Sequence, residues 1–217
     1  LDLLSDSCGE SRWLESARTQ IARLDKLIRN LVELARTEET IREGASEVFS
    51  LSDIALASAE AFAPLAEAEG NTLAAEVAAG VELRGVQDDL FRLFSILLDN
   101  AVKYCDAGGT IRLSVSQRGR TVRLSVSNPC AGLNPARLPR YFDRFYRADS
   151  SRSRTTGGYG IGLSTARAIV VRHRGRLTNH YANGIITFTA LLPQVNEKRG
   201  NTSGSRGLIM PGYPAPF

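Results

Sequence analysis

The sequence predicts an α+β domain preceded by a long amphipathic helix. Apolar residues recur at steps of three and four over residues 13–39, as they do on one face of a helix. Apolar and polar residues alternate in two pairs of later segments, 110–117 with 121–127 and 176–182 with 185–192, which is typical of strands joined in hairpins. Helical patterns lie between these hairpins, so helices and strands both contribute to one core.

The composition is that of an ordinary globular protein. Of 217 residues, 43% are hydrophobic and 23% are charged, which excludes a collagen, a wholly disordered chain and a disulfide scaffold. The cysteines Cys8, Cys105 and Cys130 are widely spaced, so they predict no metal pair and fit a reducing cytosol. We find no apolar run near the ~18 residues of a membrane span and no signal peptide at the start. We therefore expect a cytoplasmic location for this chain.

The long helix carries an apolar seam with heptad spacing. The seam consists of Leu14, Ala17, Ile21, Leu24, Ile28, Leu31 and Ala35. Trp13, Leu27 and Leu34 widen this stripe on one side, which favours a helical bundle over a two-stranded coil. A lone amphipathic helix docked on the main domain is the alternative.

Two helices and two short strands are expected next. After a polar linker at 40–47, an Ala-rich helix covers Leu51–Gly70, with Ser52 as its N-cap and a kink or break at Pro64. The short strands are placed at 72–77 and 81–84. The second helix begins at Asp88 or Asp89 and buries Leu90, Leu93, Phe94, Leu97, Leu98 and Ala101.

The remainder of the chain contains a long irregular segment and a tail. Residues 128–160 have little regular pattern apart from a helical patch near 135–147, and loops of this length are often active-site lids. A helix is expected over 161–174, and the last hairpin turns at 182–184. Residues 194–217 are rich in Gly, Ser and Pro and predict a disordered tail.

Positive charge is concentrated in one part of the chain. The net charge is +4, but the segment 133–176 holds ten Arg and only two Asp. Such a segment indicates an anionic partner, either nucleic acid, a membrane surface or a nucleotide phosphate. A solvated, Arg-rich loop is the simpler alternative.

Polar residues gather on one face at the end of the second helix. Ile96, Asn100, Lys103 and Tyr104 share this face by helical spacing. An amide oxygen such as that of Asn100 can coordinate Mg²⁺. A lysine one turn on can meet phosphate, and a tyrosine can cover a ribose or base. Taken alone, this pattern also fits a polar helix end without a ligand.

Two further segments have features of a phosphate site. Gly157–Leu163 is glycine-rich and opens a helix, where backbone N–H groups can approach phosphate closely. It follows no apolar strand, so it is not a Rossmann turn, and it lacks the Gly-Lys-Ser/Thr of a Walker A loop. Phe142–Arg147 combines aromatic and basic residues, which fits either a lid that carries a cation or a short amphipathic helix.

In this order and at this spacing, the three segments resemble the ATP-binding domain of sensor histidine kinases, in the superfamily that includes gyrase-type ATPases. Residues 97–104 (LLDNAVKY) resemble its N box, residues 141–147 its F box and residues 158–164 its G2 box. Residues 13–39 resemble the second helix of the dimerisation hairpin. The resemblance covers residues 1–193.

The resemblance implies a two-layer α/β sandwich, in which helices cover one face of a mixed sheet and ATP lies between helices and lid. It divides the chain into a partial dimerisation hairpin (1–42), an ATP-binding domain (43–193) and the tail (194–217). Under it, Asn100 binds Mg²⁺, Lys103 and Tyr104 contact phosphate and ribose or base, and Arg147 is a lid cation. The other nucleotide-binding residues would be Asn128, Gly132, Leu133, Gly158, Tyr159, Gly160, Ile161, Gly162, Leu163 and Thr187.

Three positions depart from the family pattern. Asn128 stands where the family has the Asp that accepts a hydrogen bond from the adenine amino group, and Cys130 replaces a Gly. The amide oxygen can still accept this bond but without charge assistance, so adenine binding should be weakened. Ile96 replaces an Asn, or the Glu that activates water in related ATPases, so hydrolysis by water should be slow.

The histidines indicate where the phosphoryl acceptor lies. His173 and His180 are the two histidines of the sequence, and both follow the glycine segment. The resemblance places the acceptor on the first helix of the dimerisation hairpin, which would end near Leu4. The acceptor is therefore expected upstream of Leu1, so that the chain binds ATP without phosphorylating itself. The resemblance implies a parent protein anchored in the cell membrane, a response regulator as partner and a possible homodimer through 13–39. A degenerate, non-catalytic nucleotide-binding or dimerisation module is the alternative function, and nucleic-acid binding is not expected.

Overall fold

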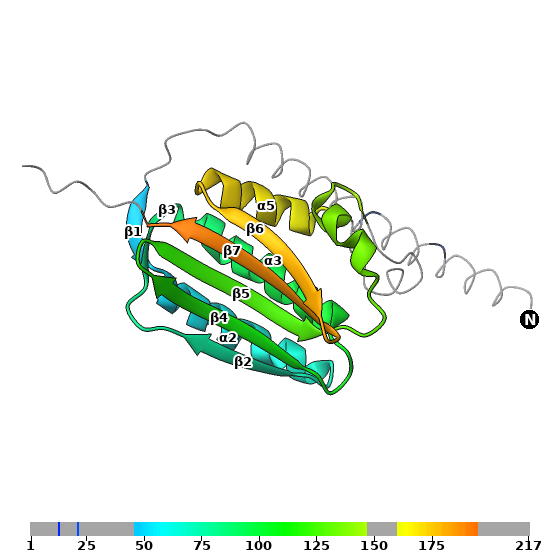
Figure 1. The fold of residues 1–217 in the computed structure, drawn as a ribbon. Helices are drawn as coiled ribbons and strands as arrows, with labels where there is room; N and C mark the ends of the chain where they lie inside the picture. Colours follow the sequence, from blue (N-terminus) through cyan, green and yellow to red (C-terminus); the bar gives the residue numbers. More distant parts are fainter. Residues whose placement is uncertain (1–12, 14–20, 22–45, 147–159, 195–217) are drawn as a thin grey trace, which may run out of the picture.

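The structure is a computed structural model that describes Trp13, Ile21 and residues 46–146 and 160–194 (Figure 1). Its main body has two layers, a five-stranded sheet and three helices on one of its faces. The prediction of a mixed sheet with helices on one face is confirmed. The elements in chain order are β1 (Glu47–Ser50), α2 (Leu51–Ala68), β2 (Thr72–Val77), β3 (Glu82–Gly85), α3 (Gln87–Tyr104), β4 (Thr110–Arg118), β5 (Thr121–Pro129), the 3₁₀ helix η1 (Pro135–Phe142), α5 (Gly162–Arg172), β6 (Arg176–Ala182) and β7 (Ile185–Pro193).

The large sheet has the strand order β2-β4-β5-β7-β6. β2 runs parallel to β4, and the other neighbours are antiparallel. Side chains alternate between the two faces along each strand. On β5, Val122, Leu124 and Val126 are buried, whereas Arg123 between them is exposed. The buried face lies against the helices, so the core is the space between the two layers.

The three helices lie side by side on this face in the order α2, α3, α5. α3 is the central helix. Its apolar stripe Leu90, Leu93, Phe94, Leu97, Leu98 and Ala101 is fully buried or nearly so, as predicted. Each of these side chains stabilises the fold by about 1.5–3 kcal/mol when it leaves water, apart from the smaller Ala101. This burial holds α3 in place and leaves its polar end available at one edge of the core.

The start of α2 differs from the prediction. The N-cap is Ser50, whose hydroxyl accepts from the N–H of Asp53 at 3.1 Å. Ser52 lies inside the helix and is buried, where its hydroxyl accepts from the N–H of Val81 at 2.9 Å and donates to the carbonyl of Ala78 at 2.7 Å. The prediction of Ser52 as N-cap is therefore wrong, because a tertiary contact uses its hydroxyl.

Two more local details differ from the sequence pattern. α2 continues through Pro64 to Ala68 without a break. Proline has no N–H to donate to the carbonyl of Glu60, four residues earlier in the helix. Glu60 and Pro64 are both exposed, so water can take the place of this hydrogen bond. Residues 47–50 form β1 against β3, where the sequence pattern predicted no strand and placed only residue 47 in a linker.

Several predicted features lie outside the described residues. These are the tail 195–217, the middle of the irregular segment at 147–159, and all of the long helix 13–39 except two positions. Those two, Trp13 and Ile21, are helical and are 79% and 65% exposed. Among the residues that the structure describes, no helix is both long enough and apolar enough to cross a membrane.

Candidate functional site

The C-terminal half of α3 and the start of α5 face each other. A Cβ atom at Gly162 would lie 3.5 Å from Cγ2 of Ile96, so the first turn of α5 lies against the stripe that Ile96 shares with Asn100 and Lys103. Asn100 and Lys103 are half-buried. The structure thus brings the glycine segment and the polar face of α3 to one place, although more than 50 residues separate them in sequence.

Lys103 is held by a charged neighbour. Its Nζ lies 2.5 Å from Oδ2 of Asp99, one turn earlier on α3. The side chain of Lys103 is 29% exposed and that of Asp99 is 53% exposed, so solvent reaches both. This pair orients the ammonium group at the end of α3.

α5 begins without a side-chain cap. Its N-cap is Ile161, which has no oxygen to accept a hydrogen bond from the first turn, and Ile161 itself is buried. The hydroxyls of Ser164 and Thr165 both donate to the carbonyl of Ile161, at 2.8 and 3.1 Å. The first N–H groups of a helix and the positive end of its dipole favour an anion. A glycine at 162 allows that anion a close approach.

The two described ends of the irregular segment are joined at Gly160. The N–H of Phe145 donates to the carbonyl of Gly160 at 2.8 Å. Gly160 has φ +72°, and a Cβ atom there would lie 2.8 Å from the backbone carbonyl carbon of Phe145 and from the oxygen of Tyr146. Phe145 also has positive φ, at 63°, which is uncommon for a residue with a side chain. The aromatic segment and the glycine segment therefore meet backbone to backbone.

Aromatic contacts fix η1 over the sheet. The ring of Phe142 packs edge-on against Phe188 of β7, with centroids 6.3 Å apart. The side-chain N–H of Asn179 on β6 donates to the carbonyl of Leu138 at 2.9 Å. The guanidinium of Arg140 lies 4.5 Å from the ring centre of Tyr146, a distance at which cation and ring attract each other. These contacts place the residues before 147 beside the start of α5.

Asn128 lies at the end of β5 on the buried face of the sheet. It is 2% exposed and is paired with Ile186 of β7. Its Nδ2 donates to the carbonyl of Pro129 at 3.0 Å. The amide thus lies among the side chains between the layers, at the end of the sheet where α3 also ends.

Asp106 ties the end of α3 to the residues after β5. Its N–H donates to the carbonyl of Pro129 at 3.0 Å, and its carboxylate accepts from the N–H of Ala131 at 2.6 Å. Sequence analysis missed this residue, because a single Asp after a helix gives no signal of a long-range contact. The contact brings Asn128 and the α3 end into one part of the molecule.

Cys105 and Cys130 lie at the same junction and pack against the core. Burial raises the pKa of the Cys105 thiol, and the nearby charges of Asp106 and Cys130 raise it further. A raised pKa lowers the thiolate fraction at neutral pH, so Cys105 is a weaker nucleophile than an unperturbed cysteine.

The structure does not bring all the predicted residues together. Thr187 lies between the buried Ile186 and Phe188 of β7, so its side chain points away from the helices, onto the other face of the sheet. Gly132 has φ +76° with open space around it, and Leu133 contacts the edge of the core. Arg147, Gly158 and Tyr159 lie outside the described residues. Two contacts bring predicted segments together: Gly162 lies against Ile96, on the α3 face that carries Asn100 and Lys103, and Gly160 bonds Phe145.

One family matches the chain in a comparison of sequences. The family described as "Histidine kinase-, DNA gyrase B-, and HSP90-like ATPase" matches residues 85–202, a range that includes α3, the irregular segment and α5. The signal transduction histidine-protein kinase BaeS of Escherichia coli (strain K12) is 31% identical over 179 residues. The match covers 82% of this chain and 38% of BaeS, so the chain spans about two fifths of that relative.

Solved structures show the same fold. The histidine kinase AdeS of Acinetobacter baumannii superposes with a TM-score of 0.68 at 18% identity, over 84% of each chain. Full-length ShkA in complex with AMPPNP also has a TM-score of 0.68, at 23% identity, over 78% of this chain and 35% of ShkA.

Proposed function

Because the chain belongs to the family of histidine kinase-, DNA gyrase B- and HSP90-like ATPases, we propose that it is the catalytic part of a sensor histidine kinase. In this function it binds ATP with Mg²⁺ and transfers the γ-phosphoryl group to a histidine side chain of an acceptor helix. The observation that carries the proposal is the contact between α3 and the start of α5. Through Ile96, it turns the α3 face that carries Asn100 and Lys103 toward the first turn of α5, whose N–H groups favour a phosphate anion.

Each residue of the junction has a separate role in this proposal. The N–H groups at the start of α5 donate to phosphate oxygens, and Lys103 neutralises part of their charge. Asn128 accepts a hydrogen bond from the adenine amino group, at the other end of the site. Such a site accelerates transfer by position and charge, with little covalent chemistry of its own.

The residues present suit Mg²⁺ better than a tightly caged metal. Among the described residues, no group of three or more His, Cys, Asp or Glu side chains could hold a metal ion. Mg²⁺ commonly uses one or two protein oxygens together with phosphate and water, and the amide oxygen of the half-buried Asn100 can supply one. When bound, the ion would neutralise phosphate charge.

The two histidines of the chain are unsuited to accept the phosphoryl group. Both ring nitrogens of His173 are engaged in hydrogen bonds to the backbone. His180 is exposed on β6 and, by strand register with Thr187, lies on the sheet face away from the helices. We therefore place the acceptor histidine outside these 217 residues. The side chain of Ile96 offers no proton acceptor for water, so we expect transfer to a histidine to exceed hydrolysis.

The test combines nucleotide binding with phosphoryl transfer. The chain is incubated with γ-labelled ATP, Mg²⁺ and a separate helical hairpin that carries an acceptor histidine. Label that appears on the hairpin with the unaltered chain, but not with the Asn100→Ala variant, supports the proposal. Binding of ATP without transfer at saturating ATP would instead indicate a non-catalytic nucleotide-binding module, and absence of binding would refute both functions.

Two partners follow from the same proposal. A second copy of the chain would pair through residues 13–39, and the exposed Trp13 and Ile21, eight residues apart, fit an apolar face of that helix. A response regulator would receive the phosphoryl group from the acceptor histidine. Sedimentation at high concentration checks the dimer, and a strict monomer would contradict it.

A further inference from the structure

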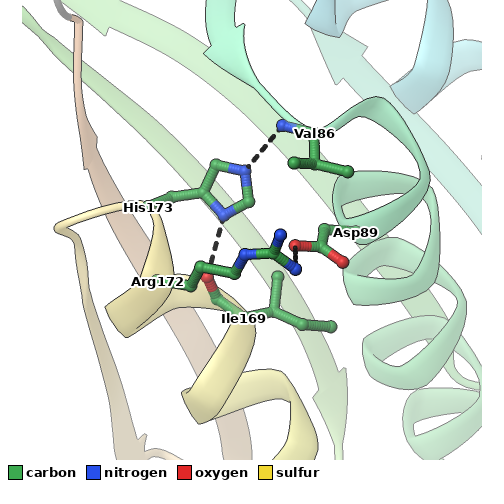
Figure 2. Close-up of polar contacts among 5 residues, drawn as sticks. All are labelled: Val86, Asp89, Ile169, Arg172 and His173. Carbon is green, nitrogen blue, oxygen red and sulfur yellow. Dashed lines mark hydrogen bonds and ion pairs between the residues drawn. The ribbon is translucent and has the colours of Figure 1, made fainter. Parts of the chain in front are cut away.

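His173, immediately after α5, connects that helix to the start of α3 (Figure 2). Its Nε2 accepts a hydrogen bond from the N–H of Val86 at 3.1 Å, and its Nδ1 lies 2.9 Å from the carbonyl oxygen of Ile169. A carbonyl oxygen only accepts, so Nδ1 carries the proton and donates. The neutral ring therefore donates to its own helix and accepts from the N-cap residue of α3.

Gly85 provides the space for this ring. A Cβ atom at Gly85 would lie 2.5 Å from both Cδ2 and Nε2 of His173. Cβ atoms do not approach other atoms so closely in folded proteins, so any side chain at position 85 would displace the imidazole. The contact between α5 and α3 thus depends on a glycine and a histidine that are 88 residues apart in the sequence.

An ion pair fixes the same junction. Nη1 of Arg172 lies 3.0 Å from Oδ2 of Asp89, in the first turn of α3 (Figure 2). The two side chains are 25% and 17% exposed, so the pair is less screened by salt than a surface pair. With the His173 bonds, it holds the end of α5 against both sliding and rotation along α3.

The opposite end of α5 carries the proposed phosphate contacts. A helix of this length spans about 16 Å, and it transmits an axial shift at His173 to Gly162 as a rigid element. The spacing between the α5 N–H groups and Asn100 on α3 is therefore determined partly at the far end of the helix. Displacements near 1 Å at a reacting site are costly.

We infer that His173 is a positioning residue for the nucleotide phosphates, because it fixes the axial position of α5 against α3. This inference rests on the proposed function. It concerns the phosphate end of the nucleotide alone, since the adenine contact at Asn128 belongs to β5 and not to α5.

The test is a double-mutant cycle read by binding of both ATP and adenosine. His173→Ala is expected to weaken ATP binding about tenfold, the effect of about one or two lost hydrogen bonds, while adenosine binding changes less than about twofold. Gly85→Ala should weaken ATP binding similarly, because its Cβ displaces the ring. The double variant should be no weaker than His173→Ala, since the methyl group then has space. Such non-additivity is the signature of a direct contact.

Two further variants serve as controls. His180→Ala removes an exposed histidine on β6 and should leave both affinities unchanged. His173→Gln keeps one donor and one acceptor and should recover part of the ATP affinity. If His173→Ala does not fold, His173→Gln takes its place in the comparison of ATP and adenosine affinities. Calorimetry gives the affinities, and thermal unfolding without nucleotide gives the stability of each variant.

The outcomes separate this inference from the proposed function. Equal losses of ATP and adenosine affinity, additive effects of the two substitutions, or unchanged ATP binding in His173→Ala and His173→Gln would each overturn the positioning role. Failure of the unaltered chain to bind ATP would overturn the proposed function and, with it, this inference.

Discussion

Replacement of Gly160 by alanine should both destabilise the protein and weaken nucleotide binding. Gly160 has φ +72°, and the new Cβ atom would lie 2.8 Å from backbone atoms of Phe145 and Tyr146. Backbone cannot rotate away as a flexible side chain can. The substitution therefore forces the aromatic segment away from the start of α5, and the 2.8 Å hydrogen bond from Phe145 N–H to the carbonyl of Gly160 is lost with it.

The magnitude follows from three contributions. An alanine in the left-handed conformation costs about 1–2 kcal/mol, and loss of a net hydrogen bond costs about 1 kcal/mol. Crowding of well-packed atoms adds about 1–3 kcal/mol. The free energy of unfolding should thus fall by about 3–6 kcal/mol. At about 3–4 °C for each kcal/mol in a domain of this size, the Tm should fall by about 10 °C or more.

Gly119→Ala is the matched control. Gly119 also has positive φ, at 57°, but a Cβ atom there would meet no heavy atom within 4 Å. This variant should show only the backbone cost of about 1–2 kcal/mol and normal ATP affinity. Thermal unfolding and titration with ATP·Mg²⁺ measure both quantities. Equal Tm losses in the two variants, or unchanged ATP affinity in Gly160→Ala, would refute the reasoning.

Three other predictions concern the end of β5, the α3 cap and the α3–α5 junction. Asn128→Asp should lower the stability of the nucleotide-free protein, because it buries a carboxylate. It should raise ATP affinity severalfold, because a charged acceptor makes a stronger hydrogen bond to the adenine amino group. Weaker ATP binding in calorimetry would contradict the proposed adenine contact. Because burial raises its pKa, Cys105 should react with iodoacetamide more slowly than an unperturbed cysteine at neutral pH, and the rate should increase as pH rises. The stability that this thiol contributes is present below the ordinary cysteine pKa and should be lost as pH rises through the raised pKa. A fast reaction of Cys105 at neutral pH, measured by peptide mass spectrometry, would contradict the raised pKa. Asp89→Asn should destabilise the protein by about 1–3 kcal/mol, because it leaves the half-buried Arg172 without its ionic partner. Glu76→Gln alters an ion pair whose side chains are 60% and 71% exposed, so it should change stability by less than about 1 kcal/mol. Equal losses of stability in denaturant unfolding would contradict this difference.

Local patterns determined much of the fold. The alternation over 121–127 and the stripe from Leu90 to Ala101 predicted β5 and α3 within a few residues, because side-chain period follows from backbone geometry alone. The shared face of Asn100 and Lys103 follows from the same period. The alternation over 185–192 also predicts that the side chain of Thr187 points to the face opposite that of its two apolar neighbours, although the family resemblance had placed Thr187 in the site.

Contacts between distant segments were decided by the tertiary structure. Ser52 looked like a helix cap, but its hydroxyl bonds Val81 and Ala78, and residues 47–50 form a strand only because β3 lies beside them. No local pattern encodes such partners, since they depend on which elements pack together.

The sequence by itself determined the helices, the hairpins and the three segments that resemble a nucleotide site. The tertiary structure decided how these segments meet. It placed the start of α5 on the Ile96 stripe, joined Phe145 to Gly160, and put His173 into the space that Gly85 leaves. The physical reason is that periodicity acts over a few residues, whereas each of these contacts depends on how two separate elements fit against one core.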